Sequence, residues 1–261
     1  MGSDTLQRYI RTRAGDETLY GMIAADGAVR VLAGAPWLGV CETGRTLHPG
    51  SFHLLAPCAP TKIVAIGRNY VDHAAELGNQ VPKEPLMFLK PPSALLDPFG
   101  VIRRPPESLT QRIDYEGELA LVMGSRCSSI GADRAMEHVF GYTIANDVTA
   151  RDLQKRDGQW TRAKGFDTFC PVGPCIVREL PLGARIRTFL NDAKKPVQDG
   201  AIDGMVFGPA ALVAAVSAVM TLEPGDLILT GTPAGIGPLA PGDRVRVEIA
   251  GIGTLENSLA D

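Results

Sequence analysis

The chain has 261 residues, of which 45% are hydrophobic, and a formal net charge of −3 at pH 7. This length suffices for one large domain with a small appended unit. The scattered lysines and arginines give no basic surface for nucleic acid or for an anionic membrane. The longest apolar stretch, residues 210–220, is shorter than the ~20 residues that a membrane-spanning helix needs, so it predicts a buried helix.

The five cysteines show no Cys-x-x-Cys pair. An odd number of cysteines without metal-binding spacing favours reduced thiols. The N-terminus reaches charged residues almost at once, which is not typical of a signal peptide. We therefore expect a cytoplasmic protein.

The start of the chain is typical of a small β-rich unit. Residues 18–25 and 28–32 are apolar-rich and are joined by Asp26-Gly27, a pair typical of a β-hairpin turn. A proline-rich linker follows these runs. The sequence predicts a small β-rich N-terminal region over residues 1–58 and a catalytic domain over residues 61–261.

The middle of the chain predicts short strands and short helices. Residues 62–67 are an apolar run typical of a buried strand. Residues 70–77 have helical character that ends at Gly78-Asn79. Further strands are predicted over residues 115–123 and 139–148, and a helix over residues 149–159.

The last third of the chain repeats a turn that precedes a strand. A Glu-Pro-Gly-Asp turn at residues 223–226 precedes the apolar run 227–229, and Pro-Gly-Asp precedes the alternating run 244–249. Strands outnumber helices and do not alternate with them as a parallel α/β fold requires. The sequence therefore predicts a mainly β (α+β) fold.

Two carboxylates lie two residues apart in a predicted strand. Glu116 and Glu118 therefore share a face, which continues through the apolar residues Ala120 and Val122. Carboxylates on a face that becomes buried repel each other and lose solvation, and a cation would remove both costs. Asp147, at the end of the next strand, could supply a third ligand. Three carboxylates suit Mg²⁺ or Mn²⁺.

The same spacing has a second interpretation. Glu116 and Glu118 could lie on a solvated strand edge, and Asp147 could cap the following helix. Spacing alone leaves both interpretations open, because such patterns are common.

His73 and Glu76 are three residues apart and would share one face of a helix. A carboxylate can orient an imidazole and raise its basicity, which makes a pair that activates water. An exposed polar helical turn is the alternative interpretation.

Several residues could bind the substrate near a metal. Arg151 and Gln154 follow Asp147 on a predicted helix, and Lys164 comes later. A cation there could hold a carboxylate or stabilise an enolate, although the same positions suit surface charges. The glycine-rich segment 230–237 is not a P-loop; its amides and the Thr232 hydroxyl could bind a carboxylate, or it is a turn.

Six short motifs follow one another along the chain: GRNYVDH (67–73), FLKPPS (88–93), DYEGEL (114–119), GYTIANDVTARD (141–152), KGFD (164–167) and LTGTP (229–233). In this order they resemble the fumarylacetoacetate hydrolase family over roughly residues 61–258. The resemblance implies a mixed β-sandwich roll that forms a homodimer and binds Mg²⁺ or Mn²⁺. The short N-terminal region resembles that of bacterial-type members, so fumarylacetoacetate itself is not the expected substrate.

The resemblance also assigns roles to single residues. It implies metal ligation by Glu116, Glu118 and Asp147. The hydrolytic pair of several members is matched by His73 and Glu76. Family positions in the catalytic and substrate-binding pocket are matched by Lys164, Arg151, Gln154, Thr232 and Lys90.

The resemblance favours a hydrolase that cleaves a carbon–carbon bond in acylpyruvate-type 2,4-dioxo acids. The metal would chelate the 2-oxo acid, His73 with Glu76 would activate water, and Lys164 would help to stabilise the enolate of pyruvate.

Alternative activities would use the same metal site, because they also pass through a metal-bound enolate. These are decarboxylation of oxaloacetate and isomerisation of 2-hydroxyhepta-2,4-diene-1,7-dioate in aromatic catabolism. The His73–Glu76 pair favours hydrolysis over them, because only hydrolysis needs activated water. A non-catalytic protein that binds 2-oxo acids is a third interpretation.

Overall fold

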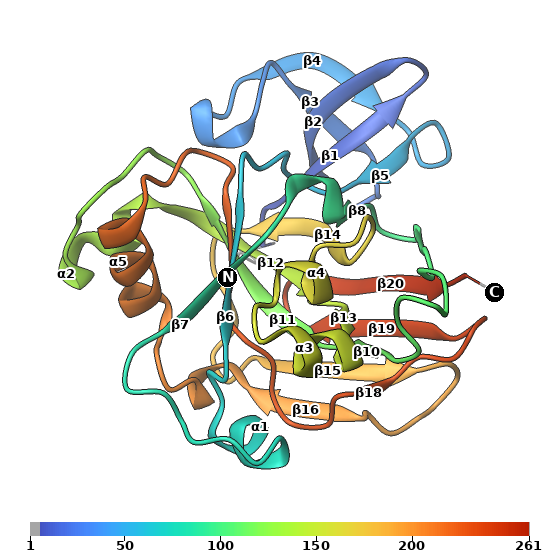
Figure 1. Cartoon of the computed structure of the whole chain (residues 1–261). Coiled ribbons are helices and arrows are strands. Elements are labelled where there is room, and N and C mark those ends of the chain that lie inside the picture. The colour runs from blue at the N-terminus through green and yellow to red at the C-terminus, as the bar shows by residue number, and fades with distance from the viewer. Residues whose placement is uncertain (1–5, 261) are drawn as a thin grey trace.

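Strands dominate this computed structural model, which describes residues 6–260 (Figure 1). The N-terminal half holds β1 (Arg8–Ala14), β2 (Glu17–Ile23), β3 (Val29–Leu32), β4 (Glu42–Leu47), β5 (His53–Leu55), β6 (Ile63–Gly67), β7 (Leu86–Lys90), β8 (Leu95–Leu96), β9 (Val101–Ile102), β10 (Ile113–Tyr115) and β11 (Gly117–Met123). The C-terminal half holds β12 (Val139–Asn146), β13 (Thr149–Ala150), β14 (Cys170–Val177), β15 (Arg185–Leu190), β16 (Gln198–Ala201), β17 (Leu227–Leu229), β18 (Gly237–Pro238), β19 (Arg244–Ile249) and β20 (Gly253–Leu259). The α-helices are short: α1 (Val71–Glu76), α2 (Ala132–Ala135), α3 (Arg151–Asp157), α4 (Thr161–Lys164) and α5 (Pro209–Val219). The mainly β prediction is confirmed.

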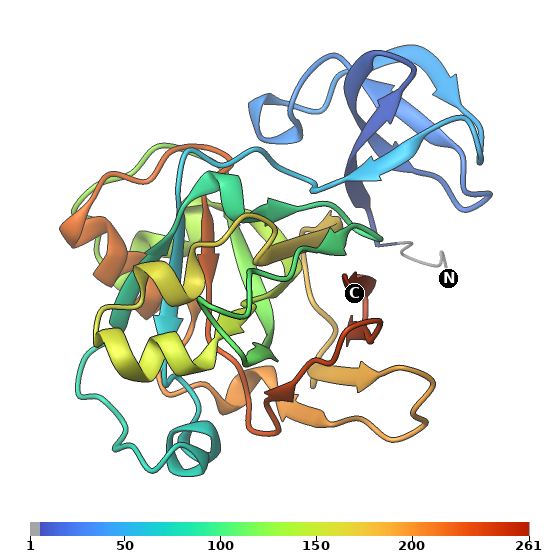
Figure 2. The same cartoon turned by 45° about the vertical axis from the view of Figure 1, so that its right-hand side comes forward.

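The largest sheet has 12 strands and runs through the whole molecule. Its order is β4-β3-β2-β1-β14-β12-β11-β17-β6-β7, with β5 on β1 and β8 on β14. The strands β1 to β5, in blue, form a lobe at the top of Figures 1 and 2. This lobe joins the rest of the sheet where Arg8 and Tyr9 of β1 lie opposite Val177 and Ile176 of β14. The division of the chain near residues 58–61 stays a prediction.

The predicted hairpin near the N-terminus is confirmed. Strands β2 and β3 are antiparallel, and the amide of Ala24 donates to the carbonyl of Ala28 at 2.8 Å. Gly27 in this turn has a φ of 81°, which glycine adopts without steric cost.

Strand β11 is buried on both faces. Its residues Leu119 and Leu121 pack in the main core together with β15, β19, β20 and α5. Ala120 and Val122 point to the opposite face and pack in a second core. Glu118 shares this second face by the alternation of the strand, so its carboxylate enters a buried layer.

Two sequence predictions need correction around this strand. The predicted strand 115–123 is split at Glu116, because β10 pairs with β13 and β18 in a separate sheet while β11 pairs with β12 and β17. The predicted helix 149–159 begins only at Arg151, because Thr149 and Ala150 pair with β10. It ends before Gly158, whose φ is 71°.

The apolar stretch near residue 210 forms α5. The helix buries Leu212, Val213 and Val216, but Val219 is 67% exposed, so the predicted buried helix is buried along one face. Within residues 6–260 the helices are too short or too polar to cross a membrane.

Candidate metal centre

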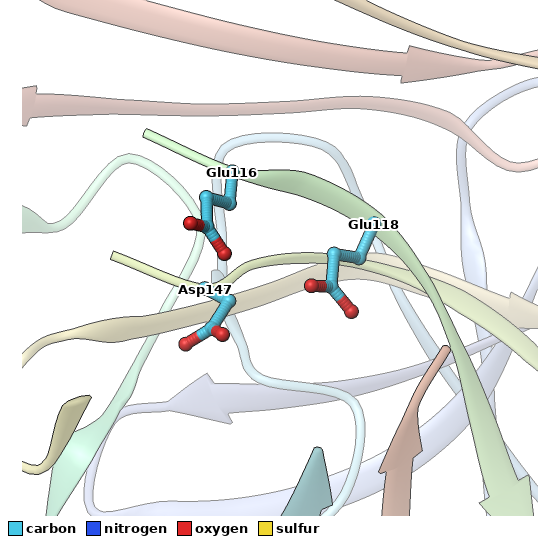
Figure 3. A group of neighbouring side chains, drawn as sticks. All are labelled: Glu116, Glu118 and Asp147. Carbon is cyan, nitrogen blue, oxygen red and sulfur yellow. The ribbon is translucent and has the colours of Figure 1, made fainter. Parts of the chain in front are cut away.

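Three acidic side chains converge at one end of β11 and β12. Glu116 directly precedes β11, Glu118 lies in β11, and Asp147 directly follows β12. The amide of Asp147 donates to the carbonyl of Glu116 at 2.8 Å, which fixes the two chain segments against each other. One oxygen from each carboxylate lies within 4.8 Å of the others, and Figure 3 shows the three groups directed to the same side. All three residues are buried.

Two buried lysines contact this triad, which we define as Glu116, Glu118 and Asp147. The ammonium of Lys164 donates to Glu116 Oε2 at 2.8 Å and to Asp147 Oδ2 at 2.5 Å. The ammonium of Lys90 donates to Asp147 Oδ1 at 2.6 Å. Lys90 and Lys164 are among the largest fully buried side chains of the described chain. Asp147 is therefore held by two cations.

Arg151 links the triad to a further buried carboxylate. Its guanidinium donates to Glu116, and its Nε donates to Asp114 Oδ2 at 2.9 Å. Its Nη1 donates to Gln154 Oε1 at 2.5 Å. Since arginine stays charged in proteins, this side chain is a fixed positive charge beside Glu116.

The carboxylates of the triad differ in their ionisation. Burial disfavours the charged form of Glu116, yet the charges of Lys164 and Arg151 hold its pKa well below the usual range. Burial and the neighbouring carboxylates Asp147 and Glu116 raise the pKa of Glu118 well above its usual value. Within residues 6–260, the hydrogen bond that Glu118 accepts comes from the amide of Gly231, at 2.7 Å. Glu118 thus lacks the ammonium partner that the other two carboxylates have.

This arrangement fits a divalent cation. The donor atoms are carboxylate oxygens, which Mg²⁺ and Mn²⁺ prefer. A cation shared by the triad would also compensate the buried charge of Glu118, for which no side chain of the described residues supplies an ion pair.

The triad opens into a cavity of about 350 Å³. This volume lies at the lower end of the range for small-molecule sites. Eight of the residues that the sequence predicts for the site line it: His73, Glu116, Glu118, Asp147, Arg151, Gln154, Lys164 and Thr232. Lys90 and Glu76 adjoin it through their contacts with Asp147 and His73. The structure therefore brings the predicted residues together around one cavity.

The glycine-rich segment after β17 contributes Thr232 to the lining of the cavity. Thr232 Oγ1 donates to the carbonyl of Gly117 at 2.8 Å and accepts a hydrogen bond from Gln198 Nε2 at 2.8 Å. Because the amide of Gly231 donates to Glu118, this amide supports the triad and is not free for a substrate.

Helix α1 carries His73 to the cavity. His73 Nδ1 lies 3.3 Å from Glu76 Oε2, and His73 is 5% exposed. The other oxygen of Glu76 accepts a hydrogen bond from the amide of Gly235 at 3.0 Å. Glu76 therefore orients the imidazole and joins α1 to the glycine-rich segment.

The sequence did not identify some residues of the cavity. Arg68 and Phe88 line the cavity, and Asp114 lies behind it as a partner of Arg151. All three occur in the six motifs, but only the fold reveals these contacts. Trp160 lies in a short loop between α3 and α4, where no periodic pattern points to a site.

The comparisons with known proteins are consistent with this geometry. A family profile described as "Fumarylacetoacetate (FAA) hydrolase C-terminal" matches residues 62–260. The chain belongs to this fumarylacetoacetate hydrolase family. A second profile, "Rv2993c-like, N-terminal", matches residues 7–57. The family resemblance expected from the six motifs is confirmed.

Two relatives illustrate this membership of the fumarylacetoacetate hydrolase family. Protein Rv2993c of Mycobacterium tuberculosis is 47% identical over 232 residues, which cover 87% of this chain and 86% of that protein. The mitochondrial oxaloacetate tautomerase fahd2 of Xenopus laevis is 45% identical over 225 residues, which cover 81% of this chain and 69% of that protein.

Two solved structures are also similar. The 5-carboxymethyl-2-hydroxymuconate delta-isomerase of Mycobacterium smegmatis has a TM-score of 0.89 and 41% identity, covering 97% of this chain and 99% of that chain. The fumarylpyruvate hydrolase of Pseudomonas aeruginosa, in complex with Mn²⁺ and pyruvate, has a TM-score of 0.71 and 33% identity, covering 81% of this chain and 93% of that chain. The predicted family-type β-sandwich roll with its β-rich N-terminal region is confirmed. The homodimer and the cytoplasmic location stay predictions.

Proposed function

We propose that this protein is a divalent-metal-dependent isomerase that moves a proton between the enol and keto forms of small 2-oxo acids. The observation that carries the proposal is the ammonium of Lys164, which contacts Glu116 and Asp147 inside the cavity. The relatives support an isomerase over a hydrolase, because they include an oxaloacetate tautomerase and a hydroxymuconate isomerase. The substrates would be oxaloacetate or a 2-hydroxy-dienedioate.

The triad would hold Mg²⁺ or Mn²⁺ through the oxygens of Glu116, Glu118 and Asp147. When bound, the ion supplies a Lewis acid that stabilises negative charge on the carboxylate and the 2-oxygen of the acid. The Mn²⁺ complex of the fumarylpyruvate hydrolase supports this choice of metal.

The side chains around the cavity would handle the proton. Isomerisation removes one proton from the 2-hydroxyl oxygen and adds one proton to a carbon of the unsaturated chain. His73 Nδ1 faces Glu76, so Nε2 is the ring nitrogen that would carry the proton to the substrate. Lys164, with its positive charge beside the triad, would stabilise the oxygen anion between the two transfers.

Hydrolysis of an acylpyruvate is the second candidate. The His73–Glu76 contact supports it, because the same pair could deprotonate water. The fumarylpyruvate hydrolase also supports it, at 33% identity. We rank it second because the oxaloacetate tautomerase and the hydroxymuconate isomerase are 45% and 41% identical.

In the experiment, metal-stripped protein is incubated with each of four acids: enol-oxaloacetate, a 2-hydroxy-dienedioate, acetylpyruvate and fumarylpyruvate. Each incubation is run in the presence and in the absence of Mn²⁺, and the products are followed by NMR. We expect enol–keto conversion or double-bond migration only with the metal. Lys164→Met should lower kcat/KM roughly 100- to 1,000-fold, whereas Lys195→Met, at an exposed lysine, should leave it unchanged. Metal-dependent release of pyruvate and an acid, or of CO₂, without isomerisation would overturn the proposal in favour of the hydrolase or the decarboxylase.

A further inference from the structure

Arg68 has an unusual backbone conformation for its residue type. Its φ is 58°, in the left-handed region that costs a non-glycine residue free energy. Among the non-glycine residues of the described chain with positive φ, Arg68 is the one that lines the cavity. Strained backbone of this kind is kept where surrounding contacts enforce it, and it often marks a functional site.

The neighbouring residue holds Arg68 in this conformation. Asn69 is fully buried, and its Nδ2 donates to the carbonyls of Thr230 and Phe207 at 2.7 and 3.0 Å. Its Oδ1 accepts a hydrogen bond from the amide of Phe207 at 2.8 Å. Strand β6 precedes Arg68, and the hydrogen bonds of Asn69 fix the chain after it. The backbone at Arg68 is therefore held on both sides, which sets the direction in which its side chain leaves the chain.

The guanidinium of Arg68 lies against an aromatic wall, which we define as the rings of Trp160 and Phe88. Its central carbon lies 5.9 Å from the ring centre of Trp160, within the range of a cation–π contact. A Cβ at Gly67 would lie 2.7 Å from the Trp160 ring, so glycine at this position lets the indole pack against β6. The ion pairs found within residues 6–260 do not include Arg68, so its charge is free for a ligand.

The aromatic wall joins two cations of the cavity. Trp160 contacts Phe88 edge-to-face, with ring centres 5.1 Å apart, and the ammonium of Lys164 lies 5.1 Å from the centre of Phe88. Lys164 therefore stands at the triad end of the wall and Arg68 at the opposite end. A ligand along this wall meets a positive charge at each end and an apolar, flat surface between them.

We propose that Arg68 binds the distal carboxylate of a dicarboxylic substrate and thereby selects 2-oxo diacids over 2-oxo monoacids. This inference rests on the proposed function, in which the 2-oxo-carboxylate end of the acid lies at the triad. The planar fork of a guanidinium binds a carboxylate through two hydrogen bonds, whereas a methyl group at the same place leaves the fork unsatisfied. The unsaturated middle of the substrate packs on Phe88 and Trp160.

The test measures binding of saturated 2-oxo acids, whose keto forms dominate at equilibrium, to the Mn²⁺-loaded protein by calorimetry, and the acids are compared in pairs. Each pair has one chain length and differs only at the distal end, as 2-oxoadipate and 2-oxohexanoate do; a shorter and a longer pair cover other lengths. We expect the diacid of at least one pair to bind roughly 10- to 100-fold more tightly, the range of a charge-assisted hydrogen bond. Equal affinity within every pair overturns the proposal.

Variants assign this preference to Arg68. Arg68→Met should reduce the preference to less than about threefold while the monoacid binds as before, and Arg68→Lys should keep part of it. Arg156→Met, at an exposed arginine of α3, removes the same charge outside the cavity and should leave the preference unchanged. Lys155 is another cation that lines the cavity. Equal weakening of both acids in Arg68→Met, or loss of the preference in Lys155→Met instead, overturns the proposal. If a thermal melt shows that Arg68→Met is not folded, the diacid preference is measured in Arg68→Lys and in Trp160→Phe instead.

The two proposals fail in different ways. A diacid preference that depends on Arg68, without turnover of any enol, keeps this inference and removes the isomerase. Isomerase turnover without a diacid preference keeps the proposed function and removes the role of Arg68.

Discussion

At the scale of single residues, Glu118 differs most from its neighbours. Glu116 and Asp147 each accept a hydrogen bond from an ammonium, whereas Glu118 accepts one from a backbone amide. Its buried charge therefore costs free energy in the metal-free protein and should favour metal binding.

Substitution of Glu118 by glutamine should stabilise the metal-free protein and weaken the stabilisation that the metal gives. Glu118→Gln removes the buried charge but keeps an oxygen for the amide of Gly231. We expect the metal-free protein to gain on the order of 1 kcal/mol, a typical size for one substitution, and to lose most of the rise in Tm that Mn²⁺ gives the wild type. Melting curves in EDTA and in Mn²⁺ measure both effects. Glu107→Gln, at an exposed glutamate, is the control, and a full Mn²⁺ effect in Glu118→Gln would contradict the assignment.

The difference in the free energy of unfolding between Glu118→Gln and the wild type should depend on pH. Burial and the carboxylates Asp147 and Glu116 raise the pKa of Glu118 on folding. The stability that this group contributes is present below its unfolded pKa of about 4.3 and is lost as pH rises through the raised folded pKa. In metal-free buffer the advantage of Glu118→Gln should therefore be small near pH 4 and grow as pH rises. A gap that is constant with pH would show that charge is not the cause.

The sequence predicts some of these residues well and misses others. Glu116 and Glu118 were found because alternation in a strand is local, and the predicted shared face holds although the strand is interrupted at Glu116. The role of Arg68 depends on a positive φ and on a ring from a distant loop, neither of which a local pattern encodes.

At the scale of elements, α1 has two links to the rest of the site. Glu76 contacts His73 with one oxygen and the amide of Gly235 with the other. The charge of this side chain and its anchoring role can be separated by substitution.

Glu76→Gln should lower kcat while α1 stays in place. The amide oxygen of glutamine can still accept the hydrogen bond from Gly235, but it no longer supports positive charge on His73. We expect kcat to fall roughly 10- to 100-fold, with hydrogen exchange of α1 unchanged, whereas Glu76→Ala should also speed that exchange. Asp72→Asn, exposed on the same helix, serves as the control. Wild-type kcat in Glu76→Gln would rule out a role of its charge in proton transfer.

Elements with strong local patterns were predicted, and those defined by distant partners were not. The hairpin of β2 and β3 and the strands β6, β17 and β19 follow from turn residues and apolar runs. The change of sheet between β10 and β11 lies inside one predicted strand, and only the partner strands β13 and β12 distinguish its two parts.

At the scale of the whole molecule, Asp226 joins the segment before β6 to the turn before β17. Its Oδ1 accepts hydrogen bonds from Thr61 N, Thr61 Oγ1 and Lys62 N, and its Oδ2 accepts them from Lys62 Nζ and Glu223 N. Asp226 is 0% exposed, so these five donors depend on it.

Asp226→Asn should destabilise the fold much more than the same change in a similar turn. The new side-chain NH₂ group would face a donor of Lys62 or of Glu223, and two donors cannot form a hydrogen bond with each other. We expect a loss of about 3 kcal/mol in the free energy of unfolding. Asp243→Asn, in the second Pro-Gly-Asp turn, affects a partly exposed side chain that bonds Ala240 N and Asn191 Nδ2, and should cost about 1 kcal/mol. Urea unfolding of both variants measures the difference. Equal losses would show that the burial of Asp226 and its contact with Lys62 add nothing to the stability.

The ammonium groups of Lys90 and Lys164 have a consequence for the order of events at the triad. The site holds three cations, Lys90, Lys164 and Arg151, and they match the charges of Glu116, Asp147 and Asp114. Because burial raises the pKa of Glu118, its neutral form is favoured and little net charge remains before any ligand arrives. In that state an anionic acid is not attracted, whereas a divalent ion would displace the proton of Glu118 and add positive charge. We expect compulsory sequential binding, with the cation first and the acid second.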